Sequence, residues 1–196
     1  YGLLPVLRQK IPTESLRRFT MKKELLRKQI LTAMFTALIC AATLVIQIPT
    51  PVTSGYVNVG DCFVLTAGWF LGPWYGLFAG GVGSALADLI SAYPHYIPGT
   101  FVIKGLMALV AALLSHRLRG KQPSRVGRLI SALAAELIMV GGYFLYAWAI
   151  LGKAVTAAVT SVPSNLLQGA VGIVGGMLLI EVLDRLPFVN RNHRAA

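Results

Sequence analysis

Three charged residues lie inside or beside the apolar runs of the stretch from Gly55 to Lys104: Asp61, Asp88 and Lys104 itself. An ionisable side chain at membrane depth is costly, so it usually faces the protein interior and marks a ligand site or an ion pathway. Two interpretations of Asp88 and Lys104 stay open. They form a structural ion pair, or one or both are polarised toward a ligand. Asp61 begins an apolar run too short to cross a bilayer as a helix, so we expect it to contact protein rather than lipid.

The loop at residues 93–98, Tyr-Pro-His-Tyr-Ile-Pro, is dense in aromatic rings. Its prolines stiffen the backbone and hold the rings in place, an arrangement that suits stacking on a planar heteroaromatic ligand. Anchoring at the membrane interface is the alternative role for one of these tyrosines. His95 is not predicted to bind a metal, because no second ligand is spaced near it.

Further polar and aromatic groups occur in the last two apolar runs. Asn165 and Gln168 lie in the first turn of the final helix, where their amides suit recognition of ring nitrogens or hydroxyls. Glu136 lies deeper, and we favour a role in holding the bundle together over substrate contact. The candidate substrate-binding residues are Asn58, Asp88, Tyr93, His95, Lys104, Tyr143, Trp148, Asn165 and Gln168.

No catalytic constellation is visible in the sequence. P-loop, dinucleotide-binding, zinc-protease and nucleophile-elbow motifs are absent, and the glycines at 80–83 lie inside an apolar helix where no phosphate would be cradled. The two cysteines, Cys40 and Cys62, show neither metal-ligand spacing nor a disulfide framework. The sequence therefore predicts no enzyme, no bound cofactor and no metal.

Composition indicates an integral membrane protein. Of 196 residues, 56% are hydrophobic and 13% are charged, against roughly 25% charged in ordinary globular domains. Several apolar runs approach the ~20 residues that span a bilayer as a helix. Together with two shorter runs between them, they predict an all-α protein of six transmembrane helices. The long runs are Ile30 to Ile48, Phe101 to Leu114, Leu129 to Leu151 and Leu166 to Leu183.

The net charge of +11 comes from three basic patches, which are Arg8 to Lys28, Arg117 to Arg128 and Arg185 to Arg194. With six spans, all three fall on one side of the membrane, which the positive-inside rule makes cytoplasmic together with both termini. The patches are thus explained without nucleic acid, as topology determinants beside anionic lipid.

The chain divides into a basic N-terminal segment (1–27), a six-helix membrane domain (28–186) and a basic tail (187–196). Met21-Lys22-Lys23-Glu24 resembles a natural start, so we expect residues 1–20 to be an upstream or added extension.

The first predicted helix carries a stripe of small residues. Ala33, Ala37 and Ala41 recur every four residues and form a flat surface that lets another helix approach closely in lipid. Packing within the bundle and docking of a partner both explain this stripe.

A group of motifs resembles the substrate-binding S component of energy-coupling-factor (ECF) vitamin transporters, in the branch with riboflavin, pyridoxine and hydroxymethylpyrimidine members. These motifs are Gly55-Tyr-Val-Asn-Val-Gly-Asp61, Gly72-Pro73, Gly80-Gly-Val-Gly-Ser-Ala-Leu-Ala-Asp88 and Pro98-Gly-Thr-Phe-Val-Ile-Lys-Gly105. The resemblance implies six helices, a vitamin bound near the outer face, and partners: a membrane coupling subunit and two cytoplasmic ATPases that hydrolyse ATP. It also implies that Ala33-Met-Phe-Thr-Ala37 docks the coupling subunit.

We therefore predict an S component in a bacterial cell membrane that captures a small heteroaromatic vitamin or precursor outside the cell. A pyridoxine- or hydroxymethylpyrimidine-like ligand is the first choice, and riboflavin is the second. One rival is a self-sufficient secondary transporter that uses Asp88, Lys104 and Glu136 as an ion relay. Another is a membrane enzyme or assembly factor with Asp61, Asp88 and His95 around a metal.

Overall fold

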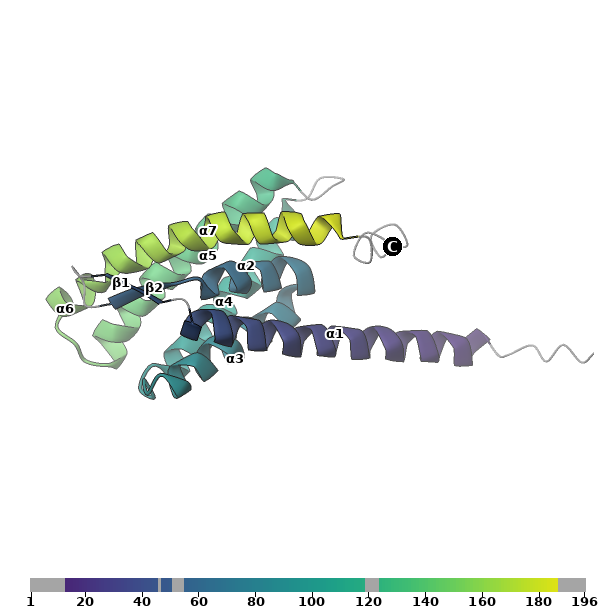
Figure 1. Cartoon of the computed structure of the whole chain (residues 1–196), viewed down its shortest axis with the longest axis horizontal. Coiled ribbons are helices and arrows are strands. Elements are labelled where there is room, and N and C mark those ends of the chain that lie inside the picture. The colour runs from purple at the N-terminus through teal and green to yellow at the C-terminus, as the bar shows by residue number, and fades with distance from the viewer. Residues whose placement is uncertain (1–12, 46, 51–54, 119–123, 187–196) are drawn as a thin grey trace, which may run out of the picture.

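The computed structural model describes residues 13–45, 47–50, 55–118 and 124–186. Within them the chain forms a bundle of six long helices, with a short helix, a π-helical turn and two strands at one end (Figure 1). The long helices are α1 (Thr13–Val45), α2 (Gly60–Leu71), α3 (Pro73–Ile90), α4 (Ile97–Arg117), α5 (Arg125–Leu145) and α7 (Ser161–Arg185). The smaller elements are β1 (Gln47–Thr50), β2 (Gly55–Asn58), the π-helical turn η1 (Tyr146–Ile150) and α6 (Val155–Val159).

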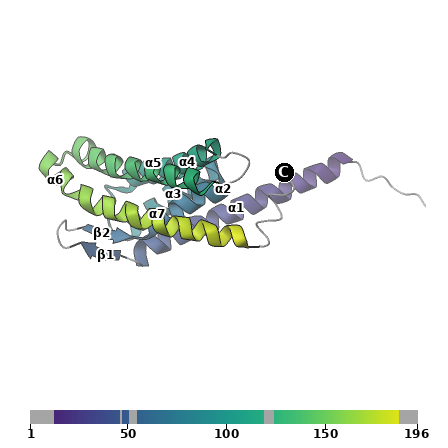
Figure 2. The ribbon, with the colours of Figure 1, turned by 90° about the horizontal axis from the view of Figure 1, so that it is seen from above.

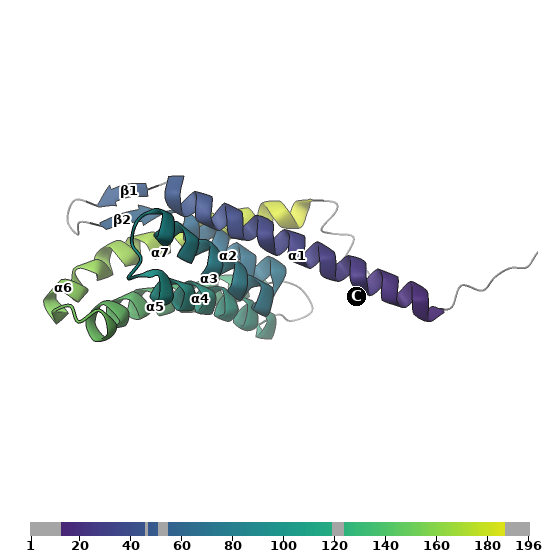
Figure 3. The same cartoon turned by 90° about the horizontal axis from the view of Figure 1, so that it is seen from below.

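The helices run alternately in opposite directions, so the described chain reverses at two ends of the bundle. One end, here called the hairpin end, holds β1, β2, α6 and the loop between α3 and α4 (Figure 2). At the opposite end α2 turns into α3 at Gly72, α4 stops at Arg117, and α7 stops at Arg185. We call this the basic end. The N-terminal half of α1 extends beyond it (Figure 3).

Within the described residues, four helical stretches are long and apolar enough to cross a membrane. They are Arg18–Val45, Ile97–Arg117, Arg125–Ile150 and Val155–Arg185. Helix α2 is apolar but has only 12 residues, which gives a rise of about 18 Å against a hydrocarbon core of ~30 Å. Ten of its residues are buried by neighbouring helices, so the short helix is surrounded by protein. The expectation that Asp61 contacts protein is confirmed, since its exposure is 1%.

A short antiparallel hairpin departs from the all-α prediction. Strands β1 and β2 pair from Gln47 with Asn58 to Thr50 with Gly55. Val57 favours extended backbone, and Pro49 is tolerated in a two-stranded ribbon whose outer edges pair with no further strand among the described residues. The prediction of a helical membrane domain is correct for the rest of the described chain.

Helix α1 begins at Thr13 and continues without a break through residue 28, where the sequence placed a domain boundary. Residues 13–27 are rich in Glu, Leu, Arg and Lys, which have high helix propensity. The helix therefore continues through these residues and extends beyond the bundle. The predicted basic tail at 187–196 lies outside the described residues.

Glycines let α3 approach its two main neighbours, α1 and α4. A Cβ atom on Gly83 would lie 2.7 Å from the carbonyl oxygen of Thr36 in α1, and one on Gly80 would lie 2.9 Å from that of Lys104 in α4. Backbone contacts this close need glycine. The tight packing fixes the depth at which Lys104 enters the bundle.

Candidate functional site

A cavity of about 380 Å³ opens at the hairpin end, between the α5–η1 segment on one side and α6–α7 on the other. Its size falls in the range of roughly 300–1,000 Å³ that is usual for small-molecule sites. The lining comes from the end of β2 and from α1, α3, α4, α5, η1, α6, α7 and their loops. Segments distant in sequence therefore meet around one space.

Eight of the nine candidate residues line this cavity, and the ninth, Trp148, does not. Trp148 is 45% exposed and stacks on Phe144 with ring centroids 6.3 Å apart. In the π-helical turn η1, the neighbouring residue Ala147 faces the cavity in place of Trp148 and is 4% exposed. The residues that the structure brings together are Asn58, Asp88, Tyr93, His95, Lys104, Tyr143, Asn165 and Gln168.

Four buried residues, Asn58, Asp61, Lys104 and Gln168, form a hydrogen-bonded chain at the inner wall of the cavity, here called the polar floor. Lys104 Nζ pairs with Asp61 Oδ1, and Gln168 Nε2 donates to Asp61 Oδ2 at 2.7 Å. Asn58 Nδ2 in turn donates to Gln168 Oε1 at 3.0 Å. The polar floor therefore ties β2, α2, α4 and α7 together, and three of its members line the cavity.

Of the two interpretations left open for Asp88 and Lys104, the structural ion pair is not what the structure shows, because Lys104 pairs with Asp61. Asp88 lies in the last turn of α3 and has Thr100, one turn before Lys104 along α4, as its hydrogen-bonding neighbour. Oδ2 of Asp88 is buried and has no hydrogen-bond partner within the described part of the chain. Asp88 thus lines the cavity with an unsatisfied acceptor atom.

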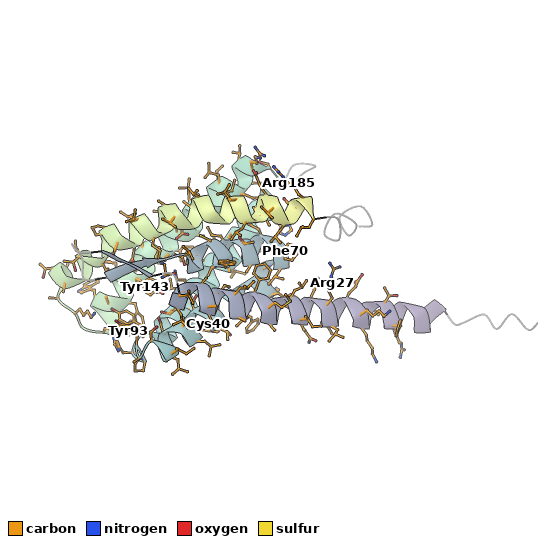
Figure 4. All side chains as sticks on the ribbon, viewed as in Figure 1. Arg27, Cys40, Phe70, Tyr93, Tyr143 and Arg185 are labelled. Atoms are coloured by element: carbon orange, nitrogen blue, oxygen red, sulfur yellow. The ribbon has the colours of Figure 1, made fainter. Side chains whose placement is uncertain are left out.

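Aromatic rings from the loop at residues 93–96 lie against α5 and η1. The Tyr96 ring centroid is 4.8 Å from that of His95, 6.4 Å from Tyr143 and 6.0 Å from Tyr146. Tyr146 donates a hydrogen bond from its hydroxyl to the carbonyl oxygen of His95 at 2.8 Å, which fixes the loop to η1. Figure 4 shows Tyr93 and Tyr143 together at the hairpin end.

Tyr143 joins the aromatic rings to the polar floor. Its hydroxyl lies 3.1 Å from Oγ1 of Thr100, and Nζ of Lys104 lies 5.5 Å from its ring centroid. The cavity lining therefore combines aromatic rings with amide, hydroxyl, carboxylate and ammonium groups. Such a site can bind a flat, polar-edged molecule.

Sequence reasoning missed several lining residues. Tyr96 belongs to the same aromatic loop as Tyr93 and His95, and Lys153 donates to its hydroxyl at 3.0 Å. Ser161 and Ser164 precede Asn165 and Gln168 at helical spacing, a signal that places all four on one face. The missed lining residues with polar side chains are Thr43, Ser84, Tyr96, Thr100, Lys153, Thr160, Ser161 and Ser164.

Within the described residues, no group of three His, Cys, Asp or Glu side chains is placed to hold a metal ion. Glu136 is not part of the cavity lining. Glu136 extends from α5 toward α2 and α7. Its Oε1 atom lies close to Gly172 of α7, and Cβ of Asp61 in α2 lies close to the same glycine.

Comparison with known proteins gives a matching family model and two relatives. Residues 25–185 match the model described as "ECF-type riboflavin transporter, S component". An uncharacterised protein of Pyrococcus woesei is 34% identical over 148 residues, which cover 75% of this chain and 95% of the relative. The thiamine precursor transporter HmpT of Lactococcus lactis subsp. cremoris (strain MG1363) is 25% identical over 171 residues, or 87% and 95% of the two chains.

The fold is shared with solved structures, one of which matches most of this chain. It is described as "Structure and mechanism of the S component of a bacterial ECF transporter" and superimposes with a TM-score of 0.62. The match covers 80% of this chain and 95% of the other at 21% sequence identity. At this identity the likeness concerns the arrangement of the helices rather than the ligand.

Proposed function

Because the chain belongs to the S-component family of energy-coupling-factor transporters, we propose that it captures a small heteroaromatic vitamin or vitamin precursor in the cavity at the hairpin end. As an S component it is a multi-pass membrane protein of a vitamin transporter, and it works with an energy-coupling module of coupling and ATPase subunits. In this proposal one membrane coupling subunit and two cytoplasmic ATPases drive uptake, and this chain only binds.

The cavity lining carries the proposal. Tyr93, His95 and Tyr143 offer ring faces and edges, which suit stacking on a planar ligand. The unsatisfied carboxylate oxygen of Asp88 and the amide of Asn165 offer hydrogen-bonding groups for its polar edge. A compact ring with several polar substituents matches this combination of walls.

A pyridoxine- or hydroxymethylpyrimidine-like ligand is the first choice, and riboflavin is the second. The similarity to a thiamine precursor transporter supports a single small ring. The family model is named for riboflavin, whose three-ring system needs more apolar lining than the mostly polar cavity residues provide.

The proposed orientation puts the hairpin end outside the cell. Among the described residues, Arg117, Arg125, Arg128 and Arg185 all lie at the basic end, and Figure 4 shows Arg27 and Arg185 on that side, away from Tyr93. The positive-inside rule makes this side cytoplasmic. Both termini are then cytoplasmic, and the cavity faces the medium from which the ligand is captured.

The alanine stripe is the proposed docking surface for the coupling subunit. Ala33, Ala37 and Ala41 are all exposed in the isolated chain, so packing within the bundle does not account for the stripe. A bulky side chain there would hold a partner helix away. We expect Ala37→Trp to abolish co-purification with the partner subunits and ATP-driven uptake while ligand binding persists. Val174→Trp, on the exposed face of α7, is the control and should leave both intact.

Native mass spectrometry of the gently purified protein, with a panel of pyridoxine, hydroxymethylpyrimidine, thiamine and riboflavin, tests the ligand. We expect one molecule of a single-ring compound to bind and to compete with any molecule that co-purifies. A complex with riboflavin alone would overturn the first choice. Failure of every heteroaromatic compound to bind would overturn the proposed function.

The same protein tests the ion-relay rival through uptake in cells. A secondary transporter would take up ligand without ATPase partners and would stop when the proton gradient collapses. The relay needs Asp88 and Lys104 to exchange a charge, whereas Lys104 is paired with Asp61. We therefore expect uptake to depend on the partner subunits.

A further inference from the structure

Glu136 is a buried ionisable residue that the proposed ligand site does not use. Its residue exposure is 5%, and neither Oε1 nor Oε2 has a hydrogen-bond partner within the described residues. Unsatisfied carboxylate oxygens in a protein interior are rare, because burying an ion without compensating partners is very costly. Both oxygens of one side chain are unsatisfied here, which calls for an explanation.

Among the described residues, no group around Glu136 donates a hydrogen bond to it. Helix α7 faces it with glycines: a Cβ atom on Gly172 would lie 2.6 Å from Oε1, and one on Gly169 would lie 3.3 Å from Oε2. Helix α2 contributes Asp61 and the thiol of Cys62. Helix α4 contributes Lys104. These neighbours are one carboxylate, one thiol and one ammonium group.

The ammonium group of Lys104 already has a partner other than Glu136. Lys104 pairs with Asp61, and Asp61 also accepts from Gln168. Along α5 itself, Arg128 is bonded to Asp184 at the basic end and the hydroxyl of Tyr143 lies beside that of Thr100. Every charged group that faces or flanks Glu136 therefore has another partner.

The charges balance only when Glu136 is neutral. Asp61 and Lys104 cancel each other, so an ionised Glu136 would leave one net negative charge on the group of Asp61, Lys104 and Glu136, with two carboxylates beside one lysine. Like charges this close disfavour joint ionisation, and an unpaired buried charge is strongly destabilising. A proton on Glu136 removes both penalties.

We propose that Glu136 is a proton-binding site beneath the cavity, and that its proton keeps the polar floor in the arrangement that binds ligand. Loss of the proton draws Lys104 away from Asp61 and toward Glu136. Asp61 is then left with Gln168 as its hydrogen-bonding partner in the polar floor, so the carboxylate and Gln168 shift together, and through Gln168 the position of Asn58 changes. Since Lys104, Gln168 and Asn58 line the cavity, ligand affinity and protonation of Glu136 are linked, each changing the other by the same factor.

The proton itself is tested without any ligand. Infrared spectra of the protein in lipid nanodiscs contain a carbonyl stretching band from each protonated carboxylic acid, a band that ionised carboxylates lack. We expect this band at neutral pH in the wild type and its loss in Glu136→Gln, whereas Asp88→Asn, the matched control, should keep it. A wild-type-minus-Glu136→Gln spectrum with only ionised carboxylate bands at neutral pH would refute the proton site.

The linkage, which rests on the proposed function, is tested by ligand affinity from acidic to alkaline pH. We expect wild-type affinity to fall by up to about tenfold per pH unit once Glu136 loses its proton. Glu136→Gln imitates the protonated side chain, so it should bind like the acidic wild type and keep its affinity at alkaline pH. Parallel pH profiles for the two proteins would refute the linkage. If no vitamin binds the wild type, the proposed function fails, and the infrared band still decides the proton site.

Discussion

Helices α5 and α7 are in direct contact at the basic end of the bundle and are separated by the cavity at the hairpin end. At the basic end, Arg128 Nη1 bonds to Asp184 Oδ2 at 2.7 Å and Arg125 Nε to Glu181 Oε1 at 2.9 Å. At the hairpin end the cavity separates the same helices. There Gln168 of α7 bonds to Asp61 of α2, and the Tyr143 hydroxyl of α5 lies beside that of Thr100 in α4. Tyr146, in the turn that follows α5, bonds to the aromatic loop. One pair of helices is thus closed by salt bridges at one end and kept apart at the other.

The two ends also differ in what solvates their charges. The side chains of Arg125 and Glu181 are partly exposed, so water replaces a lost partner in this pair. Lys104 and Asp61 are 5% and 1% exposed, so each depends on the other. The same type of interaction therefore contributes little in the exposed Arg125–Glu181 pair and much in the buried Lys104–Asp61 pair.

The largest effect should come from removing one partner of the buried pair. Lys104→Met leaves Asp61 buried without its cation and should destabilise the protein by about 3–5 kcal/mol. The double variant Asp61→Asn/Lys104→Met removes both charges at similar volume and should recover much of that loss. Thermal unfolding in detergent measures both variants. Equal stability of Lys104→Met and the wild type would show that water reaches the polar floor.

An intermediate effect is expected from the aromatic wall. Tyr143→Ala removes a ring that lines the cavity and a hydroxyl beside Thr100. The loss of about 1–3 kcal/mol corresponds to a roughly 5- to 150-fold weaker Kd. Trp148→Ala is the matched control, because Trp148 lies outside the cavity, and its Kd should equal that of the wild type. Calorimetric titration with the identified vitamin compares them. A large loss in Trp148→Ala alone would place the site elsewhere.

The smallest effect is expected at the basic end. Arg125→Gln breaks the pair with Glu181, but the Arg125 side chain is 75% exposed. Exposed pairs of this kind contribute about 0–1 kcal/mol. The unfolding temperature should therefore be nearly unchanged, and added salt should not widen the difference from the wild type. A loss as large as that of Lys104→Met would contradict the contrast between the two ends.

Local chemistry made much of the site predictable. The proline-bounded loop and the helical spacing of Asn165 and Gln168 are visible in the sequence, and both contribute to the cavity. The length and apolar character of the helices follow from composition, and the family resemblance is confirmed by the family model.

The partner of Lys104 was not predictable from the sequence. Asp61 and Asp88 are both carboxylates near the outer ends of apolar runs, and the choice between them depends on how deeply α2 and α3 enter the bundle beside α4. That depth is set by close glycine contacts, such as Gly80 against the backbone of Lys104. The facing of Trp148 was missed because regular helical spacing does not anticipate the π-helical turn at 146–150.

The π-helical turn η1 changes the helical spacing of side chains where α5 reaches the cavity. In η1 the amide of Leu151 bonds to the carbonyl oxygen of Tyr146, five residues earlier, so the faces of the turn are offset from those of α5 below it. Ala147 is the residue of this turn that lines the cavity. A larger side chain at 147 would therefore narrow the cavity without changing which residues of α5 face the core.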